Sequence, residues 1–514
     1  MRKKNVVRNI LVGTISTLVK GILGFLIRRI FVERLGAELL GLSGLLLSVI
    51  AALSLLELGV GTAIYYSLYE PLLANNKEKI NAIIHLYKRI YTGIGICIFV
   101  VGLAIMPLLS LLVNTSIDIF VVQKIYLLML FDVALSYFWG YYRTLISADQ
   151  KEYIIELIDV IVYVLLSMLQ VTILLLWGNY YLYLMSKLIF GFIKNTVIRY
   201  KARSMYPEIK KKSDMRLDAK VQTKLKTDIK TIFFINISSY LVFSTDNILL
   251  SKAAGLEVVA IYGSYAMIIT TMNSLVNTIL TRANASVGNF LLTDSMESIR
   301  ALFNRFTFIN FLITGMSSVA LFTVFNPLIE VWLGPSFVWS GLIALILIYN
   351  NYSRHILASC TTFLSGAGMV NPFPAYKYIG LFEGLVNLAV SSFFIWGLGM
   401  GIYGVFLGTS VSTIVSTIAL PYTVHRYILF EKQKGYFKRY LEYLTIMLAV
   451  CLASHAGLGL LRISSALLNI LIGLFISLSL FLIVTIIRYR NADEYLYFRN
   501  IIARGAEKLR LRKV

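Results

Sequence analysis

The sequence predicts an all-α polytopic membrane protein with about fourteen transmembrane helices. Mean hydropathy is +0.77, 58% of the residues are hydrophobic and only 14% are charged, whereas soluble domains carry about 25% charged residues. Apolar runs long enough to cross about 30 Å of hydrocarbon recur along the chain. The basic residues behind the net charge of +22 lie between these runs, so we interpret the excess as membrane topology and not as a nucleic-acid site.

About fourteen runs have the length of roughly 20 residues that a spanning helix needs. They begin near Ile10, Gly41, Ile90, Phe120, Tyr153, Tyr180, Thr231, Val258, Phe306, Gly341, Tyr378, Gly401, Tyr443 and Ala466. The first run follows a basic MRKK segment, as a signal peptide would, but it is long and contains Lys20. It also lacks a small-residue cleavage motif, so we expect a retained first helix.

The basic residues predict that both termini face the cytoplasm of a bacterial cell membrane. Placing the N-terminus inside puts most Lys and Arg on the inner side, including those of segments 201–230 and 489–514, as the positive-inside rule requires. Basic ends on the same side need an even number of crossings, and fourteen satisfies this condition.

A short pattern occurs twice, 219 positions apart. Its first copy is Gly36, Glu38, Leu39, Leu40, Leu42 and Gly44, and its second is Gly255, Glu257, Val258, Val259, Ile261 and Gly263. The period equals the separation of the first and seventh predicted spans, which predicts two pseudo-symmetric six-helix bundles around a central cavity. The predicted parts are an N-terminal bundle at 1–200, a basic cytoplasmic linker at 201–230, a C-terminal bundle at 231–425, two additional helices at 426–488 and a basic cytoplasmic tail at 489–514.

Three basic side chains, Lys20, Arg28 and Arg354, lie inside predicted spans. A cation at the bilayer centre costs about 2.5–3.5 kcal/mol on insertion scales, so each needs an anion or a wet cavity. At 100° per residue, Lys20 and Arg28 share one small and polar face of the first helix. This face predicts a cationic cavity that binds an anionic substrate. Arg282, at the inner end of the eighth span, fits either this site or a role as an interfacial anchor.

Other polar residues at membrane depth are candidates for lining that cavity. They are Lys187, Asn236, Asp246, Asn247, Asn351 and His355. Lys187 fits a cavity cation and a snorkelling lysine equally well. The deep acids Glu57 and Asp132 are candidates for binding a coupling H⁺ or Na⁺, although a salt bridge to a cavity base is the simpler role.

The sequence lacks the motifs of the main hydrolytic sites. It contains no G-x-x-x-x-G-K-[ST], HExxH or GxSxG, so neither ATP-driven pumping nor metal or serine hydrolysis has a candidate site. Cys97, Cys360 and Cys451 are isolated and fit packing roles better than a metal site or disulfide. We therefore expect a carrier that is not an enzyme and has no cofactor.

Several segments together resemble the polysaccharide transporter branch of the multidrug/oligosaccharidyl-lipid/polysaccharide flippase superfamily. These segments are LVKGILGFLIRRIFVERLGAELLGLSGL, LELGVGTAIYYSLY, STDNILLSKAAGLEVVAIYGSY and GIYGVFLGTSVSTI. The resemblance implies alternating-access flipping of an undecaprenyl-diphosphate-linked oligosaccharide to the outer leaflet, for capsule, exopolysaccharide or O-antigen synthesis. Related lipid II flippases carry basic residues on the first and eighth helices, near the positions of Lys20, Arg28 and Arg282 here.

The resemblance also implies partners and a rival function. The partners are the lipid-linked oligosaccharide, the bilayer, and a polysaccharide polymerase and glycosyltransferases, and a monomer is the expected state. A multidrug exporter of the same superfamily is the alternative. It typically moves organic cations and would line its cavity with carboxylates, for which Glu57 and Asp132 are the deep candidates. A membrane polymerase or ligase is less well supported, because no long outer loop is predicted.

Overall fold

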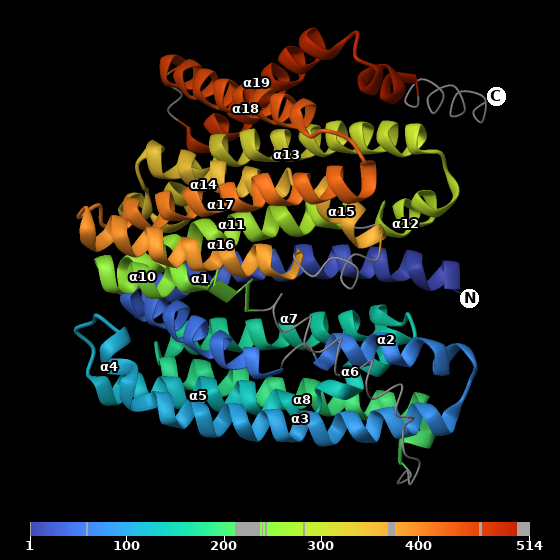
Figure 1. Cartoon of the computed structure of the whole chain (residues 1–514). Helices are drawn as coiled ribbons and strands as arrows, with labels where there is room; N and C mark the ends of the chain where they lie inside the picture. The colour runs from blue at the N-terminus through green and yellow to red at the C-terminus, as the bar shows by residue number, and fades with distance from the viewer. Residues whose placement is uncertain are drawn as a thin grey trace, which may run out of the picture. The chain divides into compact units, whose positions relative to one another are not determined.

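The computed structural model describes residues 2–57, 60–210, 237–238, 240–241, 244–280, 283–367, 376–461 and 465–500. These residues form a succession of helices joined by short connections (Figure 1). Within them, ten helices are long and apolar enough to cross a membrane. The predicted class, an all-α polytopic membrane protein, is therefore confirmed.

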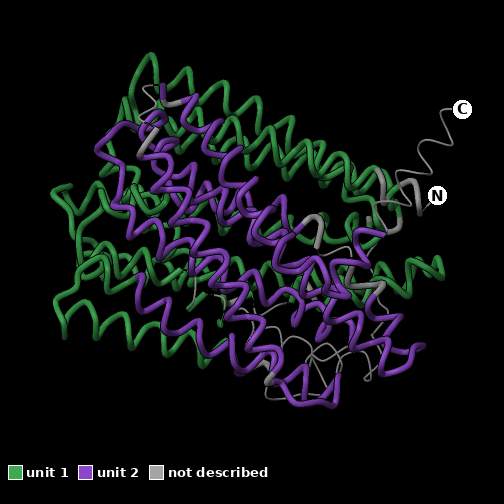
Figure 2. The backbone as a smooth tube through the Cα atoms, turned by 90° about the horizontal axis from the view of Figure 1, so that it is seen from above, with its two compact units in different colours: residues 1–263, 380–405 green, residues 264–379, 406–514 purple. Residues whose placement is uncertain are grey.

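The chain divides into two compact units (Figure 2). Unit 1 comprises residues 1–263 and 380–405, and unit 2 comprises residues 264–379 and 406–514. The boundaries fall inside three helices, α11 (Leu256–Leu280), α16 (Tyr376–Ser392) and α17 (Ile402–Val424). The division into bundles at 1–200 and 231–425 stays a prediction.

Unit 1 contains the helices of the first 254 residues and most of α16. Their bounds are α1 Arg2–Ser54, the 3-10 turn η1 Leu55–Glu57, α2 Val60–Leu73, α3 Lys77–Ile105, η2 Met106–Leu108, α4 Leu109–Leu112, α5 Ile119–Tyr137, α6 Gly140–Ala148, α7 Glu152–Leu176, α8 Tyr180–Met205, η3 Pro207–Lys210, α10 Thr245–Ala254, α16 Tyr376–Ser392 and the π-helical turn η5 Phe393–Gly397. Side chains that prefer helix N-termini begin three of them. Asn76, Asp118 and Asn179 each accept a bond from a backbone N–H of the first turn of α3, α5 and α8.

Unit 2 contains most of the remaining helices. They are α12 Ala283–Thr293, α13 Met296–Leu333, η4 Pro335–Phe337, α14 Gly341–His355, α15 Ala358–Gly366, the π-helical turn η6 His425–Leu429, α18 Lys434–Leu461 and α19 Ala466–Tyr489. Its core is aromatic, and the rings of Phe311 on α13 and Tyr443 on α18 stack with centroids 4.0 Å apart. This packing fixes α18 against α13, which supports the neighbouring helix α14.

Two glycines give the repeated pattern the same backbone conformation. Gly36 interrupts α1 with φ 84° and ψ 167°, and Gly255 separates α10 from α11 with φ 85° and ψ 178°. Positive φ with ψ near 180° is accessible almost only to glycine. The second part of α1 then contacts the start of α11, where a Cβ on Gly41 would lie only 1.7 Å from the Leu256 carbonyl oxygen. The repeated sequence thus forms a repeated elbow within unit 1.

Most predicted spans coincide with a described helix. The first two are the two parts of α1, and α7, α8, α13 and α14 cover those predicted near Tyr153, Tyr180, Phe306 and Gly341. The beginning of the seventh, near Thr231, lies outside the described residues, as do most of the linker 201–230 and the end of the tail 489–514. The total of fourteen spans therefore stays a prediction.

Candidate functional site

The ammonium of Lys20 is held by a carboxylate of the neighbouring helix. Lys20 Nζ lies 3.1 Å from Glu156 Oε2, and Ser16 Oγ donates a 2.7 Å hydrogen bond to the same oxygen. Ser16 is one turn before Lys20 on α1 and is fully buried. Because the serine side chain is short, Oε2 must lie close to α1 at that turn. The lysine therefore reaches back toward the N-terminal end of α1, the direction in which helical side chains lean.

A further polar contact fixes the same two helices to each other. Asn9 on α1 donates to the Gln150 carbonyl oxygen at 3.2 Å and accepts from the Tyr153 amide at 2.8 Å. At 100° per residue, Asn9 and Ser16 fall on the same face of α1 as Lys20. In the structure all three contact α7 or the connection before it.

The next carboxylate of α7 is paired differently. Asp159 receives both terminal nitrogens of Arg143 on α6, with one of the contacts at 3.2 Å. The Asp159 side chain is 10% exposed, whereas those of Lys20 and Glu156 are 32% and 24% exposed. Bidentate pairs of this kind are geometrically fixed, so Asp159 serves to attach α6 to α7.

Arg28 lies two turns beyond Lys20 on α1 and contacts α11. Its Nη2 donates to the Ala260 carbonyl oxygen at 2.9 Å. Gly263 leaves the space for the guanidinium, since a Cβ at this position would lie 2.9 Å from Nη2. The bond satisfies a donor of a strongly polar group inside an apolar helix pair. The adjacent Arg29 forms an exposed i,i+4 pair with Glu33 at 2.9 Å.

The candidate residues on α10 form hydrogen bonds within unit 1. Asn247 Nδ2 donates to Ser48 Oγ on α1 at 2.9 Å. Asp246 is 4% exposed, and its Oδ2 accepts from the Tyr262 hydroxyl at 3.3 Å. Both side chains therefore join α10 to neighbouring helices of the same unit.

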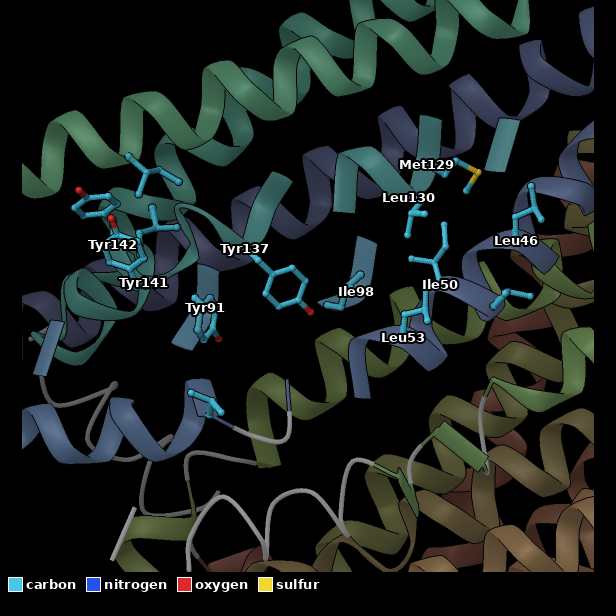
Figure 3. Close-up of a cluster of buried hydrophobic side chains, with 14 of the residues drawn as sticks. Leu46, Ile50, Leu53, Tyr91, Ile98, Met129, Leu130, Tyr137, Tyr141 and Tyr142 are labelled. Atoms are coloured by element: carbon cyan, nitrogen blue, oxygen red, sulfur yellow. The ribbon is translucent and has the colours of Figure 1, made fainter. Parts of the chain in front are cut away.

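The two deep acids have different neighbours. Asp132 on α5 lies 3.8 Å from the Lys187 ammonium on α8, which is a long ion-pair distance. Glu57, in the turn after α1, accepts hydrogen bonds from two tyrosines, Tyr91 on Oε1 and Tyr137 on Oε2 at 3.3 Å. Figure 3 shows Tyr91 and Tyr137 within the buried apolar cluster of unit 1. Glu57 is therefore a carboxyl group surrounded by phenols, and Asp132 is one that faces an ammonium.

The polar residues Asn350 and Asn351 of α14 are buried within unit 2. Asn351 accepts a 2.9 Å bond from the Asn273 amide. Asn350 donates to the Phe406 carbonyl oxygen at 3.0 Å and accepts from Ser410 at 2.7 Å. Asn350 and Asn351 therefore bond to neighbouring helices rather than facing lipid.

The end of α14 places Arg354 and His355 in its last turn, and both are half-buried. Asn310 on α13 is fully buried and caps this end, donating to the His355 and Ile356 carbonyl oxygens at 3.1 and 2.8 Å. The capping leaves the two basic side chains at a helix C-terminus, where the helix dipole favours positive charge.

The structure thus describes most of the predicted site residues and assigns them to two units. Lys20, Arg28, Lys187, Asp246 and Asn247 belong to unit 1, whereas Asn351, Arg354 and His355 belong to unit 2. Arg282 and Asn236 lie outside the described residues.

Three important contacts were not foreseen. They involve Glu156, Gly263 and Asn310. Helical spacing indicated that Lys20 lies on a polar face of the first helix. It did not indicate which helix this face contacts. Within the described ranges, no three His, Cys, Asp or Glu side chains gather closely enough to hold a metal ion.

The fold resembles that of known membrane transporters. The lipid II flippase MurJ in an inward closed conformation is 15% identical, with a TM-score of 0.63 over 94% of this chain and 99% of its own. The MATE multidrug transporter DinF-BH is 15% identical, with a TM-score of 0.62 over 84% of this chain and 97% of its own. A MOP superfamily transporter from Pyrococcus furiosus, described by the reverse polarity of its binding pocket, is 15% identical with a TM-score of 0.55 over 82% and 94%.

At these identities the likeness establishes the fold alone. None of the curated proteins compared with the chain matches it. The sequence model of one family, described as polysaccharide biosynthesis protein, matches residues 6–284, which is more than half of the chain. The match covers α1, α7, α10 and α11, and hence the Lys20 and Arg28 contacts. The chain belongs to the polysaccharide biosynthesis protein family, and its fold is that of the MOP superfamily.

Proposed function

We propose that the protein flips an undecaprenyl-diphosphate-linked oligosaccharide from the cytoplasmic to the outer leaflet, for the synthesis of capsule, exopolysaccharide or O-antigen. The substrate presents three chemistries. The diphosphate needs cations to leave the headgroup region, the sugars need a polar passage, and the polyprenyl chain stays in lipid. The family match supports a role in polysaccharide biosynthesis.

One observation carries the proposal. Two cations, Lys20 and Arg28, lie on the same face of α1 inside a candidate span, and α1 is held in the protein by α7 and α11. Lys20 has a single carboxylate contact and a side chain about a third exposed (32%). An ammonium with three donors and a partly open surface can donate hydrogen bonds to the oxygen atoms of a phosphate.

The proposed mechanism is alternating access of two bundles around a cationic central cavity. Lys20, Arg282 and Arg354 bind the diphosphate from the cytoplasmic side, and Arg28 guides its release outside. Lys187, Asn236, Asp246, Asn247, Asn351 and His355 are the proposed cavity-lining side chains. The carrier acts as a monomer with both termini in the cytoplasm, upstream of a polymerase and downstream of glycosyltransferases.

The two deep acids are the proposed coupling sites. Glu57 suits a proton, because Tyr91 and Tyr137 hydrogen-bond to its two oxygens and a phenol oxygen can also accept a hydrogen bond from a protonated carboxyl group. Asp132 suits an exchange between Lys187 and a coupling cation, because their 3.8 Å separation is long for an ion pair.

The experiment replaces Lys20, Arg28, Arg282 and Arg354 singly with Ala in cells that make a polysaccharide. We expect lipid-linked repeat units to accumulate and surface polymer to fall. Arg29→Ala is the matched control, because Arg29 is adjacent to Arg28 but pairs with Glu33 at an exposed position. Normal export by all four expressed variants would reject the cationic site.

The alternative is a multidrug exporter of the same superfamily. The likeness to DinF-BH and the carboxylate of Glu57 favour testing it. Efflux of a cationic dye from cells, lost in Glu57→Gln and unaffected in Lys20→Ala, would support this alternative over the flippase.

A further inference from the structure

We infer that Glu156 is the resting counter-ion of Lys20 and that a phosphate oxygen of the substrate replaces its carboxylate on the ammonium when the substrate binds. Glu156 then lowers the affinity for the diphosphate and promotes its release. This inference rests on the proposed function, since it concerns the same cation and the same class of ligand.

The geometry distinguishes Lys20–Glu156 from a structural ion pair. Lys20 contacts one oxygen of Glu156 at 3.1 Å, whereas Arg143 contacts both oxygens of Asp159, one turn farther along α7. The Asp159 side chain is 10% exposed and that of Glu156 is 24% exposed. A pair held by one contact lacks the second bond that fixes a bidentate pair, so a competing anion can separate it.

Ser16 explains why the separation is tolerated at this depth. Its hydroxyl donates to the same Glu156 oxygen at 2.7 Å and is fully buried. When Lys20 turns to a phosphate, Oε2 keeps this hydrogen bond, which reduces the penalty for a buried acceptor. The carboxylate therefore has a partner in both states.

The helix pair provides the fixed frame in which the exchange occurs. Asn9, two and three turns of α1 before Ser16 and Lys20, bonds to Gln150 and Tyr153. These contacts hold the register of α1 against α7 without involving the ammonium. Lys20 can thus change partner by rotating its side chain while both helices stay in place.

Charge explains the direction of the exchange. A diphosphate offers more negative charge and more acceptor oxygens than one carboxylate, and the ammonium can donate three bonds. After the oligosaccharide lipid leaves, Glu156 restores a net neutral pair. The empty carrier therefore never exposes an uncompensated Lys20 to hydrocarbon.

The test measures binding of undecaprenyl diphosphate to the purified full chain in lipid nanodiscs. We expect Glu156→Gln to bind roughly three- to tenfold more tightly than the native chain, as loss of a weak competing pair predicts. Lys20→Ala should bind more weakly, and Lys20→Ala/Glu156→Gln should match Lys20→Ala, because no ammonium remains to be released. Asp159→Asn is the control, since it removes a carboxylate of α7 that does not contact Lys20, and it should not tighten binding.

The outcomes separate the inference from the proposed function. If Lys20→Ala weakens binding but Glu156→Gln leaves it unchanged or weaker, the counter-ion exchange is wrong and the cationic site stands. If native chain and Lys20→Ala bind equally, the proposed site itself fails. Glu156→Asp provides a second variant with the charge retained and the side chain one carbon shorter. Its affinity should lie between those of the native chain and Glu156→Gln, and native or weaker binding would contradict the exchange.

Discussion

Arg28 and Asn247 are 219 positions apart, which is also the separation of the two copies of the glycine pattern. Arg28 precedes the glycine of the first copy and bonds to the helix after the glycine of the second copy. Asn247 precedes the glycine of the second copy and bonds to the helix after the glycine of the first. Arg28 donates to the Ala260 carbonyl oxygen, beyond Gly255, and Asn247 donates to Ser48, beyond Gly36. Both bonds are 2.9 Å long and lie within unit 1. The pattern therefore preserves a reciprocal polar anchor as well as an elbow, although one copy uses a charged donor and the other a neutral one.

Gly263→Ala should remove the Arg28 anchor. The added Cβ would lie 2.9 Å from Nη2, so the guanidinium must move away from the Ala260 carbonyl oxygen. We expect a loss of stability of about 1–3 kcal/mol, the range for a bond to a charged donor. Thermal unfolding of the purified protein would measure it.

The equivalent glycine of the first copy is the control for this change. A Cβ at Gly44 would meet Val259 at 3.4 Å, an ordinary contact, so Gly44→Ala should change stability by less than about 1 kcal/mol. Adding Gly263→Ala to Arg28→Ala should have little further effect if both act on one bond. Additive losses would show that Gly263 acts through another contact.

Gly36→Ala and Gly255→Ala should each destabilise the protein by about 1–3 kcal/mol, because a Cβ is strained at φ 84° and 85° with ψ near 180°. Gly13→Ala is the matched change on α1, where a Cβ meets nothing within 4 Å. It should be neutral or slightly stabilising. Unfolding temperatures in detergent would compare the three, and an equal response would remove the argument for a repeated elbow.

Asn310→Ala should loosen the end of α14. Its amide donates to the His355 and Ile356 carbonyl oxygens, and the loss of both bonds should cost about 1–3 kcal/mol. Asn310→Asp has nearly the same shape but no donor when ionised, so it should be at least as harmful. Hydrogen exchange of the α14 amides would reveal the fraying, and unchanged protection in both variants would contradict the capping role.

Glu57→Ala should destabilise unit 1 by about 1–3 kcal/mol, because it leaves the hydroxyls of Tyr91 and Tyr137 without their acceptor. Glu57→Gln keeps an acceptor and the side-chain shape, so we expect nearly native stability. If Glu57 carries the coupling proton, this variant should lose the dependence of export on a pH gradient while keeping its expression. Retained pH-gradient dependence would exclude Glu57 from coupling.

The sequence predicted the fold class and the approximate start of most helices and contained the repeated glycine pattern, because length, hydropathy and glycine placement are local properties. The polar face of α1 was also visible, because helical spacing determines which side chains share a face. The helix that contacts this face could not be predicted. Glu156 was not among the predicted site residues, because only tertiary packing places it beside Lys20.

The contacts of isolated polar residues were also not predicted from the sequence. Asn310 is one of three asparagines in α13, and no pattern indicates that it reaches the end of α14. The tyrosines around Glu57 come from α3 and α5, which are distant in sequence from the turn after α1. Contacts of this kind depend on how helices pair, and periodicity within one helix carries no such information.

The elbow at Gly36 also bears on how the protein is made. α1 is helical from Arg2 to Ser54 except at this residue, and its two parts run in different directions (Figure 1). No hydrophilic loop separates the first two spans, so no polar stretch can remain at the membrane surface between insertion of the first span and insertion of the second. During synthesis, these two spans are therefore expected to insert together as a helical hairpin, with the register of the pair already set by a single glycine.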